Sequence, residues 1–121
     1  MRHEGTAKLD KRTKDLVKRL GPNDIAIIDH VDMDRVSAET LLASGVEVVI
    51  NAAQSISGAY PNIGPLILAR GGITIIDNTG EGIFGALREG DDIVVEGENI
   101  LKDGVLVGKG TRLSVASIES A

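Results

Sequence analysis

The fold is decided by residues 46–77, which read VEVVINAAQSISGAYPNIGPLILARGGITIID. The apolar runs at the two ends, residues 46–50 and 73–77, are short and rich in β-branched side chains, which predicts buried strands. The two prolines within 61–65 fit only the first turn of a helix or the residues before it, so we expect a helix to begin there and to end near Gly71. A strand, helix, strand order predicts parallel pairing in an α/β sheet.

The same alternation extends toward the N-terminus. Residues 24–29 form a compact apolar run flanked by acids, which predicts another buried strand. A helix over 36–44 follows, with Asp34 as its N-cap and Gly45 at its end.

The last third of the chain changes character. Short apolar runs at 92–96, 99–101 and 105–107 are separated by turn residues, of which Asp103-Gly104 is the clearest hairpin signal. These runs predict an antiparallel β ribbon, and residues 108–112 supply either a closing strand or a lead-out. We therefore expect an α/β fold of parallel strands with helices, completed by a C-terminal antiparallel ribbon.

Size and composition set further bounds. The chain has 121 residues with 42% hydrophobic content, which suits one compact domain. It contains no cysteine, which excludes disulfides and thiolate metal sites and is compatible with the cytoplasm. No apolar run approaches the roughly 20 residues of a membrane helix, so we expect this chain itself to make no membrane contact.

Charge is distributed unevenly along the chain. Residues 1–20 carry seven basic and three acidic groups, whereas the remainder carries six basic and fifteen acidic groups. We expect residues 1–22 to form a basic arm with a short amphipathic helix over 13–20, ahead of one domain over 23–121. The arm would lie on the acidic body or reach toward an acidic partner, and a solvated helix face is the simpler alternative.

Charge and aromatic content also restrict the kinds of partner that this chain could bind. The body is acidic and the chain has only two aromatic residues, which argues against nucleic-acid binding. Leu16, Val17 and Leu20 share one face of the predicted first helix. A homodimer contact through these three side chains is therefore a further possibility for the partner of this chain.

The loop after residue 50 has the components of an anion site. Gly58 and Gly64 permit close approach to the backbone, and Ser55 and Ser57 offer hydroxyl donors near a helix start. The loop lacks a P-loop lysine and the spaced glycines of a dinucleotide site, so a tight structural turn is the competing interpretation. The candidate anion- or partner-binding residues are Asn51, Ser55, Ser57, Gly58, Tyr60, Asn62 and Gly64.

A second candidate site follows the strand at 24–29. Asp29, Asp32 and Asp34 surround His30 and offer donors for a hard cation or for proton transfer. The alternative is a structural role, with Asp32 forming a turn and Asp34 capping a helix. The only other histidine is His3, and the sequence shows no nucleophile and base relay, so we predict no catalytic residue.

Several of these segments together carry a family resemblance. They are Gly5-Thr-Ala7, residues 13–20 (TKDLVKRL), 28–35 (IDHVDMDR), 49–53 (VINAA), 55–58 (SISG), Tyr60-Pro-Asn62 and Gly64-Pro65. This set resembles the N-terminal domain of SteA-like proteins, which are described as cytokinetic ring proteins of bacteria. In that family the domain precedes a thiamin pyrophosphokinase-like domain and usually a C-terminal membrane anchor.

The resemblance implies a non-catalytic binding or scaffold domain in cell division or envelope assembly. Its partners would be other proteins or a neighbouring domain of the same parent. The alternative is an accessory phosphate- or nucleotide-binding domain of a kinase-like enzyme, with Mg and ATP as cofactors in the parent.

A second resemblance concerns the fold. The predicted order of elements is similar to the swivelling β/β/α domain of phosphoenolpyruvate-utilising enzymes, in which a histidine at a helix start carries the phosphoryl group. Aligning residues 67–73 with the end of that helix places Ile63 or Gly64 near the histidine position, and the sequence has no histidine after His30. The resemblance therefore implies the fold without the phosphohistidine chemistry.

Overall fold

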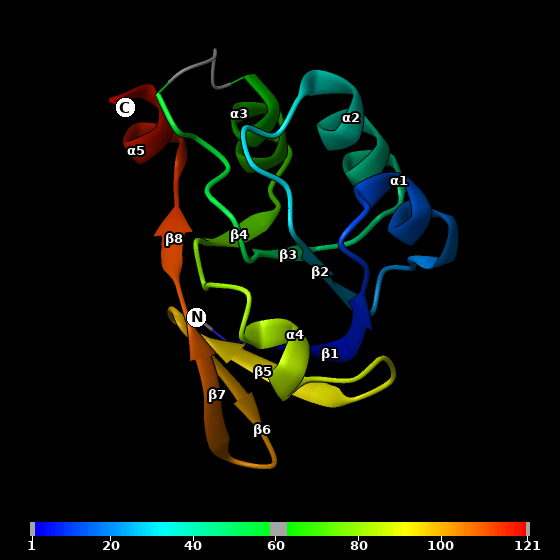
Figure 1. Cartoon of the computed structure of the whole chain (residues 1–121). Coiled ribbons are helices and arrows are strands. Elements are labelled where there is room, and N and C mark those ends of the chain that lie inside the picture. The colour runs from blue at the N-terminus through cyan, green and yellow to red at the C-terminus, as the bar shows by residue number, and fades with distance from the viewer. Residues whose placement is uncertain (1, 59–62, 121) are drawn as a thin grey trace.

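The computed structural model of the chain describes residues 2–58 and 63–120 (Figure 1). Its strands are β1 (Arg2–Leu9), β2 (Asp24–Ile28), β3 (Val48–Asn51), β4 (Thr74–Asp77), β5 (Asp92–Glu96), β6 (Asn99–Lys102), β7 (Val105–Lys109) and β8 (Thr111–Leu113). Its helices are α1 (Thr13–Leu16), the 3₁₀ turn η1 (Val17–Arg19), α2 (Arg35–Ala43), α3 (Ile63–Arg70), α4 (Ile83–Ala86) and α5 (Val115–Glu119). Within these residues the strands form one sheet in the order β7-β6-β5-β1-β2-β3-β4-β8.

The central strands β1 to β4 are parallel neighbours. The register places Ile25 beside Val48 and Val48 beside Thr74. Strands β3 and β4 are buried along their whole length, and β2 nearly so, which explains why their sequences read as continuous apolar runs. The predicted parallel pairing of these three strands is confirmed.

Residues 2–9 do not form part of a separate arm, and that expectation was wrong. They form β1, which pairs with β2 on one side and with β5 on the other. Ala7 is fully buried in the core, whereas Lys8 pairs with Asp24 at the surface. The strand was missed because its inward positions include small residues such as Gly5 and Ala7, which give a weak hydrophobic signal.

The remaining strands pair antiparallel, so the sheet is mixed. Four of its seven strand pairs are antiparallel: β1 with β5, β5 with β6, β6 with β7, and β4 with β8. The predicted C-terminal ribbon and its turn at Asp103-Gly104 are confirmed. The coarse α/β prediction therefore holds, with a larger antiparallel part than we expected.

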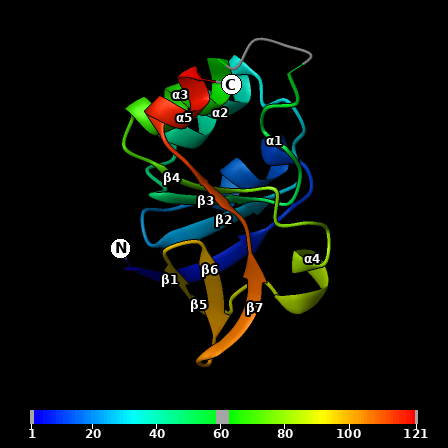
Figure 2. The ribbon, with the colours of Figure 1, turned by 90° about the vertical axis from the view of Figure 1, so that its left-hand side faces the viewer.

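Strands β7 and β8 lie at opposite edges of this sheet, although only Gly110 separates them in the chain. The sheet must therefore curl so that its two edge strands come close enough for one residue to connect them, as Figure 2 shows. A Cβ at Gly110 would lie 2.8 Å from Ile76 Cγ2 and 2.9 Å from Thr79 Cγ2. Glycine is needed there because the chain passes so close to the end of β4.

The curled sheet has a separate core on each face. The inner core joins the parallel strands to the antiparallel ones and contains Ala7, Ile25, Ile27, Val48, Ile50, Ala52, Ile76, Ile83, Leu87, Ile93, Val95 and Ile100. The outer core lies beneath α1, α2 and α3 and contains Leu16, Ala26, Ile28, Met33, Ala38, Leu41, Val46, Val49, Leu68, Ile73 and Ile75. Leu16 is thus fully buried within the chain, which leaves it unavailable for the homodimer contact considered above.

The chain ends in the short helix α5, which the sequence did not predict. Ser114 caps it, and Ser114 and Ser117 each accept a hydrogen bond from the other's backbone N–H. Ile118 is buried, and Arg70 forms a 3.0 Å ion pair with Glu119. Among the helices built from described residues, none combines the length and apolar character that crossing a membrane requires.

Candidate binding site at the carboxyl edge of the parallel strands

The carboxyl ends of β2, β3 and β4 meet at one edge of the sheet, which is where α/β folds usually place their sites. Asn51, the last residue of β3, is fully buried there. Its Oδ1 accepts hydrogen bonds from the N–H of His30 (3.0 Å) and of Ala53 (3.1 Å). Its Nδ2 donates to the carbonyl of His30 (2.8 Å) and to Ser55 Oγ (2.7 Å). Asn51 therefore ties the end of β3 to the chain that leaves β2.

Ser55 extends this connection to β4. Its hydroxyl donates to Asp77 Oδ1 (2.7 Å), and its N–H lies 3.1 and 3.2 Å from the two oxygens of the same carboxylate. Asp77 is only 6% exposed. Burial raises the pKa of Asp77, and the hydrogen bonds from Ser55 and from the Asn78 backbone oppose that rise. We call Asn51, Ser55 and Asp77 the edge network.

Sequence reasoning missed Asp77 in this network. The residue comes directly after the apolar run that forms β4, so it was expected at the end of a strand, but nothing in the chain indicated its partner. An acid that closes a buried strand is the one signal that could have suggested it.

A second set of bonds joins the loop after β2 to the loop after β3. Asp32 accepts from the N–H of Ser57 and from its hydroxyl, both at 2.8 Å. The backbone pairs as well, since Asp32 N–H donates to Gln54 O (3.0 Å) and Met33 N–H donates to Ser55 O (3.2 Å). Asp32 has a φ of 47°, a left-handed conformation that aspartate tolerates better than most residues. Its predicted role in a turn therefore fits the structure.

His30 is held on both sides of its ring. Its Nδ1 lies 3.0 Å from Thr13 Oγ1, and its Nε2 lies 3.5 Å from Asp34 Oδ1. Asp34 stands at the N-cap position of α2, as predicted. The hydroxyl of Ser37 holds the pKa of Asp34 below its usual value against the opposing effect of desolvation, and His30 contributes further in the same direction.

The three predicted cation ligands are directed to different partners. Asp32 binds Ser57, Asp34 faces His30, and Asp29 lines a separate cavity. Within residues 2–58 and 63–120, no group of three or more acidic, histidine or cysteine side chains could hold a metal ion. The structure therefore gives the cation hypothesis no support.

The glycines of the predicted anion loop differ in their surroundings. Gly58 is exposed and has a φ of 91°. Gly64 is buried in the first turn of α3, and a Cβ there would collide with the carbonyl oxygen of Met33 and lie 2.8 Å from that of Asp34. Gly64 thus serves close packing of α3 on the loop after β2. Tyr60 and Asn62 lie outside the described residues.

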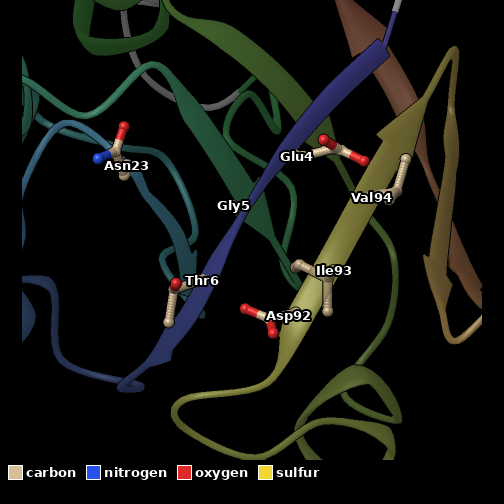
Figure 3. A pocket seen from close by; sticks show the side chains of 7 residues that line it. All are labelled: Glu4, Gly5, Thr6, Asn23, Asp92, Ile93 and Val94. Carbon is tan, nitrogen blue, oxygen red and sulfur yellow. The ribbon is translucent and has the colours of Figure 1, made fainter.

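A hollow of about 410 Å³ lies elsewhere, on β1 and β5 (Figure 3). Its charged side chains are the carboxylates of Glu4 and Asp92, with Thr6 and Asn23 beside them. Arg2 already pairs with Glu4 at 2.9 Å. This hollow is therefore less suited to an anion than the carboxyl edge.

Comparison of the chain with models of known protein families and with curated proteins finds no match to either. The SteA-like resemblance stays a prediction.

Proposed function

We propose that this chain is a non-catalytic binding and scaffold domain of a SteA-like bacterial protein, acting from the cytoplasm in cell division or envelope assembly. The observation that supports this proposal is the edge network. Asn51, Ser55 and Asp77 direct their hydrogen-bonding groups at one another and at nearby backbone, so they hold residues 51–58, which we call the recognition loop, in one shape. Such a loop is suited to recognition, because little ordering is required when a partner binds.

The proposed family assignment gains support from the position of its segments. The matching segments 28–35, 49–53 and 55–58 are joined in space, because the edge network and the Asp32–Ser57 bonds connect the first segment to the other two. Two segments of a family signature that meet at one edge of a sheet are expected of a shared recognition surface.

We further propose the swivelling β/β/α architecture for this domain. Three helices cover one face of the parallel strands (Figure 1), and the inner core packs the other face against β5 and β6. A helical layer, a parallel layer and an antiparallel layer in that order fit this architecture.

The rival function, a phosphate site in the loop that begins at Ser55, is less well supported. The hydroxyls of Ser55 and Ser57 both donate to carboxylates, those of Asp77 and Asp32. A phosphate that took these hydroxyls would lie beside two carboxylates, and like charges at such distances repel. The exposed residues Ser57 and Gly58 of this loop are therefore better suited to a protein partner or a neighbouring domain.

The proposal can be tested by crosslinking in a bacterium that carries the parent gene. A photo-reactive residue at Gln54, which is exposed in the recognition loop, is expected to capture a division or envelope protein, or a second domain of the parent. The same residue at Gly85, which is exposed on α4, is the matched control and is expected to capture none of these. Equal capture from both positions, or capture from Gln54 of neither a division or envelope protein nor a second domain of the parent, would overturn the scaffold role.

A further inference from the structure

An open cavity of about 450 Å³ lies between the loop after β1 and the loop after β2. Lys11 and Arg12 line it from the first loop and Lys14 from α1, and Asp29 and His30 line it from the second loop. The cavity lies at the carboxyl edge of the parallel strands, beside the edge network but separate from residues 51–58. Sequence reasoning did not select any of the three basic residues as a site.

These three residues hold the surplus positive charge of the N-terminal segment. Of the seven basic groups in residues 1–20, four are in ion pairs: Arg2, Lys8, Lys18 and Arg19. In the described part of the chain, Lys11, Arg12 and Lys14 are exposed and none of them is in an ion pair. Lys11 lies 5.7 Å from the centre of the Phe84 ring, which positions its ammonium without neutralising it.

The cavity also presents polar groups whose positions are fixed. The His30 ring lies between Thr13 and Asp34, and Thr13 is only 3% exposed. Ser37 of α2 lines the same wall, and its hydroxyl also faces the carboxylate of Asp34, which lies 3.5 Å from His30 Nε2. Several cations around fixed polar groups are the usual surroundings of a bound phosphate, which accepts many hydrogen bonds and carries the complementary charge.

An apolar groove adjoins this cavity. It has a volume of about 310 Å³, lies between α1 and α2, and shares Thr13, Lys14 and Ser37 with the cavity. Val17 and Val36 provide its apolar surface, and Val36 is 69% exposed. The combined site therefore has a basic end and an apolar end.

We propose that this combined site binds a phosphorylated small molecule. The phosphate lies among Lys11, Arg12 and Lys14, and the apolar part of the molecule lies against Val17 and Val36. This site is separate from the recognition loop, and its binding does not depend on the scaffold role or on the family assignment.

Asp29 distinguishes a phosphate from a cation as the occupant. Asp29 is one of the residues that line the cavity, where its negative charge repels a phosphate but would attract a metal ion. Replacing it with asparagine is therefore expected to tighten phosphate binding by about threefold, since a single charge several ångströms away has a modest effect near water. A cation site would be weakened by the same replacement.

The test is calorimetry on the whole chain with inorganic phosphate, pyrophosphate and ATP. We expect binding of pyrophosphate and ATP, weakened about fivefold by Lys14→Gln, because one exposed charge contributes a modest interaction. Arg70→Gln removes the same charge at the far end of α3 and is expected to change affinity less than twofold. Val36→Ser is expected to weaken ATP binding and to leave pyrophosphate binding unchanged.

Amide NMR on the unmodified chain gives a second measurement, in which pyrophosphate is expected to shift residues 11–14 and 29–31. The proposal fails if none of the three probes binds at millimolar concentration, or if shifts map elsewhere. It also fails if Arg70→Gln weakens binding as much as Lys14→Gln, which would indicate unspecific charge attraction. Weaker pyrophosphate binding by Asp29→Asn would also overturn the proposal, because removing a nearby negative charge must favour a bound anion. Equal effects of Val36→Ser on ATP and pyrophosphate would show that the apolar groove is not part of the site.

Discussion

Replacing Ser55 with alanine removes the central link of the edge network. The Ser55 hydroxyl accepts from Asn51 Nδ2 and donates to Asp77 Oδ1, both at 2.7 Å and both buried. After the replacement, Asn51 keeps its bond to the His30 carbonyl and Asp77 keeps the Ser55 N–H. The variant therefore loses two hydrogen bonds without leaving either partner wholly unsatisfied.

The magnitude follows from these two bonds. A hydrogen bond to a charged group contributes about 1.5–3 kcal/mol and a neutral one about 0.5–1.5 kcal/mol. We therefore expect Ser55→Ala to lower the free energy of unfolding by about 2–4 kcal/mol at neutral pH. The whole free energy of unfolding of a domain is only about 5–15 kcal/mol, so a loss of this size should be easy to measure.

The loss should also depend on pH, because burial raises the pKa of Asp77 and the Ser55 hydroxyl opposes that rise. A raised native pKa means that the folded chain loses stability as the pH rises from the unfolded pKa, about 3.9, to the native one. Without the hydroxyl the pKa of Asp77 rises further, so this loss becomes larger. The difference between wild type and variant should thus be smaller at pH 4 than at pH 7.

Urea unfolding followed by far-UV circular dichroism measures both effects, since the chain has no tryptophan and one tyrosine. Ser57→Ala is the matched control: its hydroxyl also donates to a carboxylate at 2.8 Å, but at an exposed position. We expect it to lower the free energy of unfolding by about 0.5–1 kcal/mol. The reasoning is refuted if Ser55→Ala costs no more than Ser57→Ala, or if its cost is the same at both pH values.

Two further predictions concern packing and the N-terminal charges. Gly64→Ala should lower the free energy of unfolding by about 3 kcal/mol or more, because its Cβ meets the backbone of Met33. In Gly85→Ala the added Cβ meets nothing within 4 Å, so the free energy of unfolding should change by under about 1 kcal/mol. Equal melting temperatures for the two variants would contradict this reasoning. Arg19→Gln should cost about 1 kcal/mol at pH 7, because Arg19 Nε lies 2.7 Å from Glu89 at a largely exposed position. Since Arg19 lowers the pKa of Glu89, the ion pair stabilises the fold fully above the usual pKa of that group and is lost as the pH falls through the lowered one. The cost should then shrink to the part that comes from the Arg19 bond to the Leu9 carbonyl (2.7 Å), and a cost at pH 2 equal to that at pH 7 would refute the assignment.

The sequence predicted two kinds of strand: those that are buried on both faces, and those of the C-terminal ribbon, which turn residues separate. Strands β2, β3 and β4 were recognised because both of their faces are covered, so almost every residue is apolar. Strand β1 was not recognised, since its outward side chains are charged or polar and its inward ones include Gly5 and Ala7. Its pairing with β5 also joins residues about 90 positions apart, which local patterns do not encode.

The candidate site was predictable only in its local part. Asn51 and Ser55 lie in one loop whose composition indicated a polar turn, and the structure places both in the edge network. Asp77 joins them only because β3 and β4 pair in parallel, so its role depends on the sheet. The basic cavity depends in turn on β1, because the position of this strand sets where Lys11 and Lys14 emerge.

The central claim is that the edge network holds the recognition loop in one shape. Native-state hydrogen exchange at the Ser55 amide tests it directly, because that amide donates to the buried carboxylate of Asp77. The account predicts that the Ser55 amide exchanges only by global unfolding, with the same free energy and denaturant dependence as Ile50 in β3. Exchange by a local opening several kcal/mol easier than that of Ile50, and insensitive to denaturant, would contradict it.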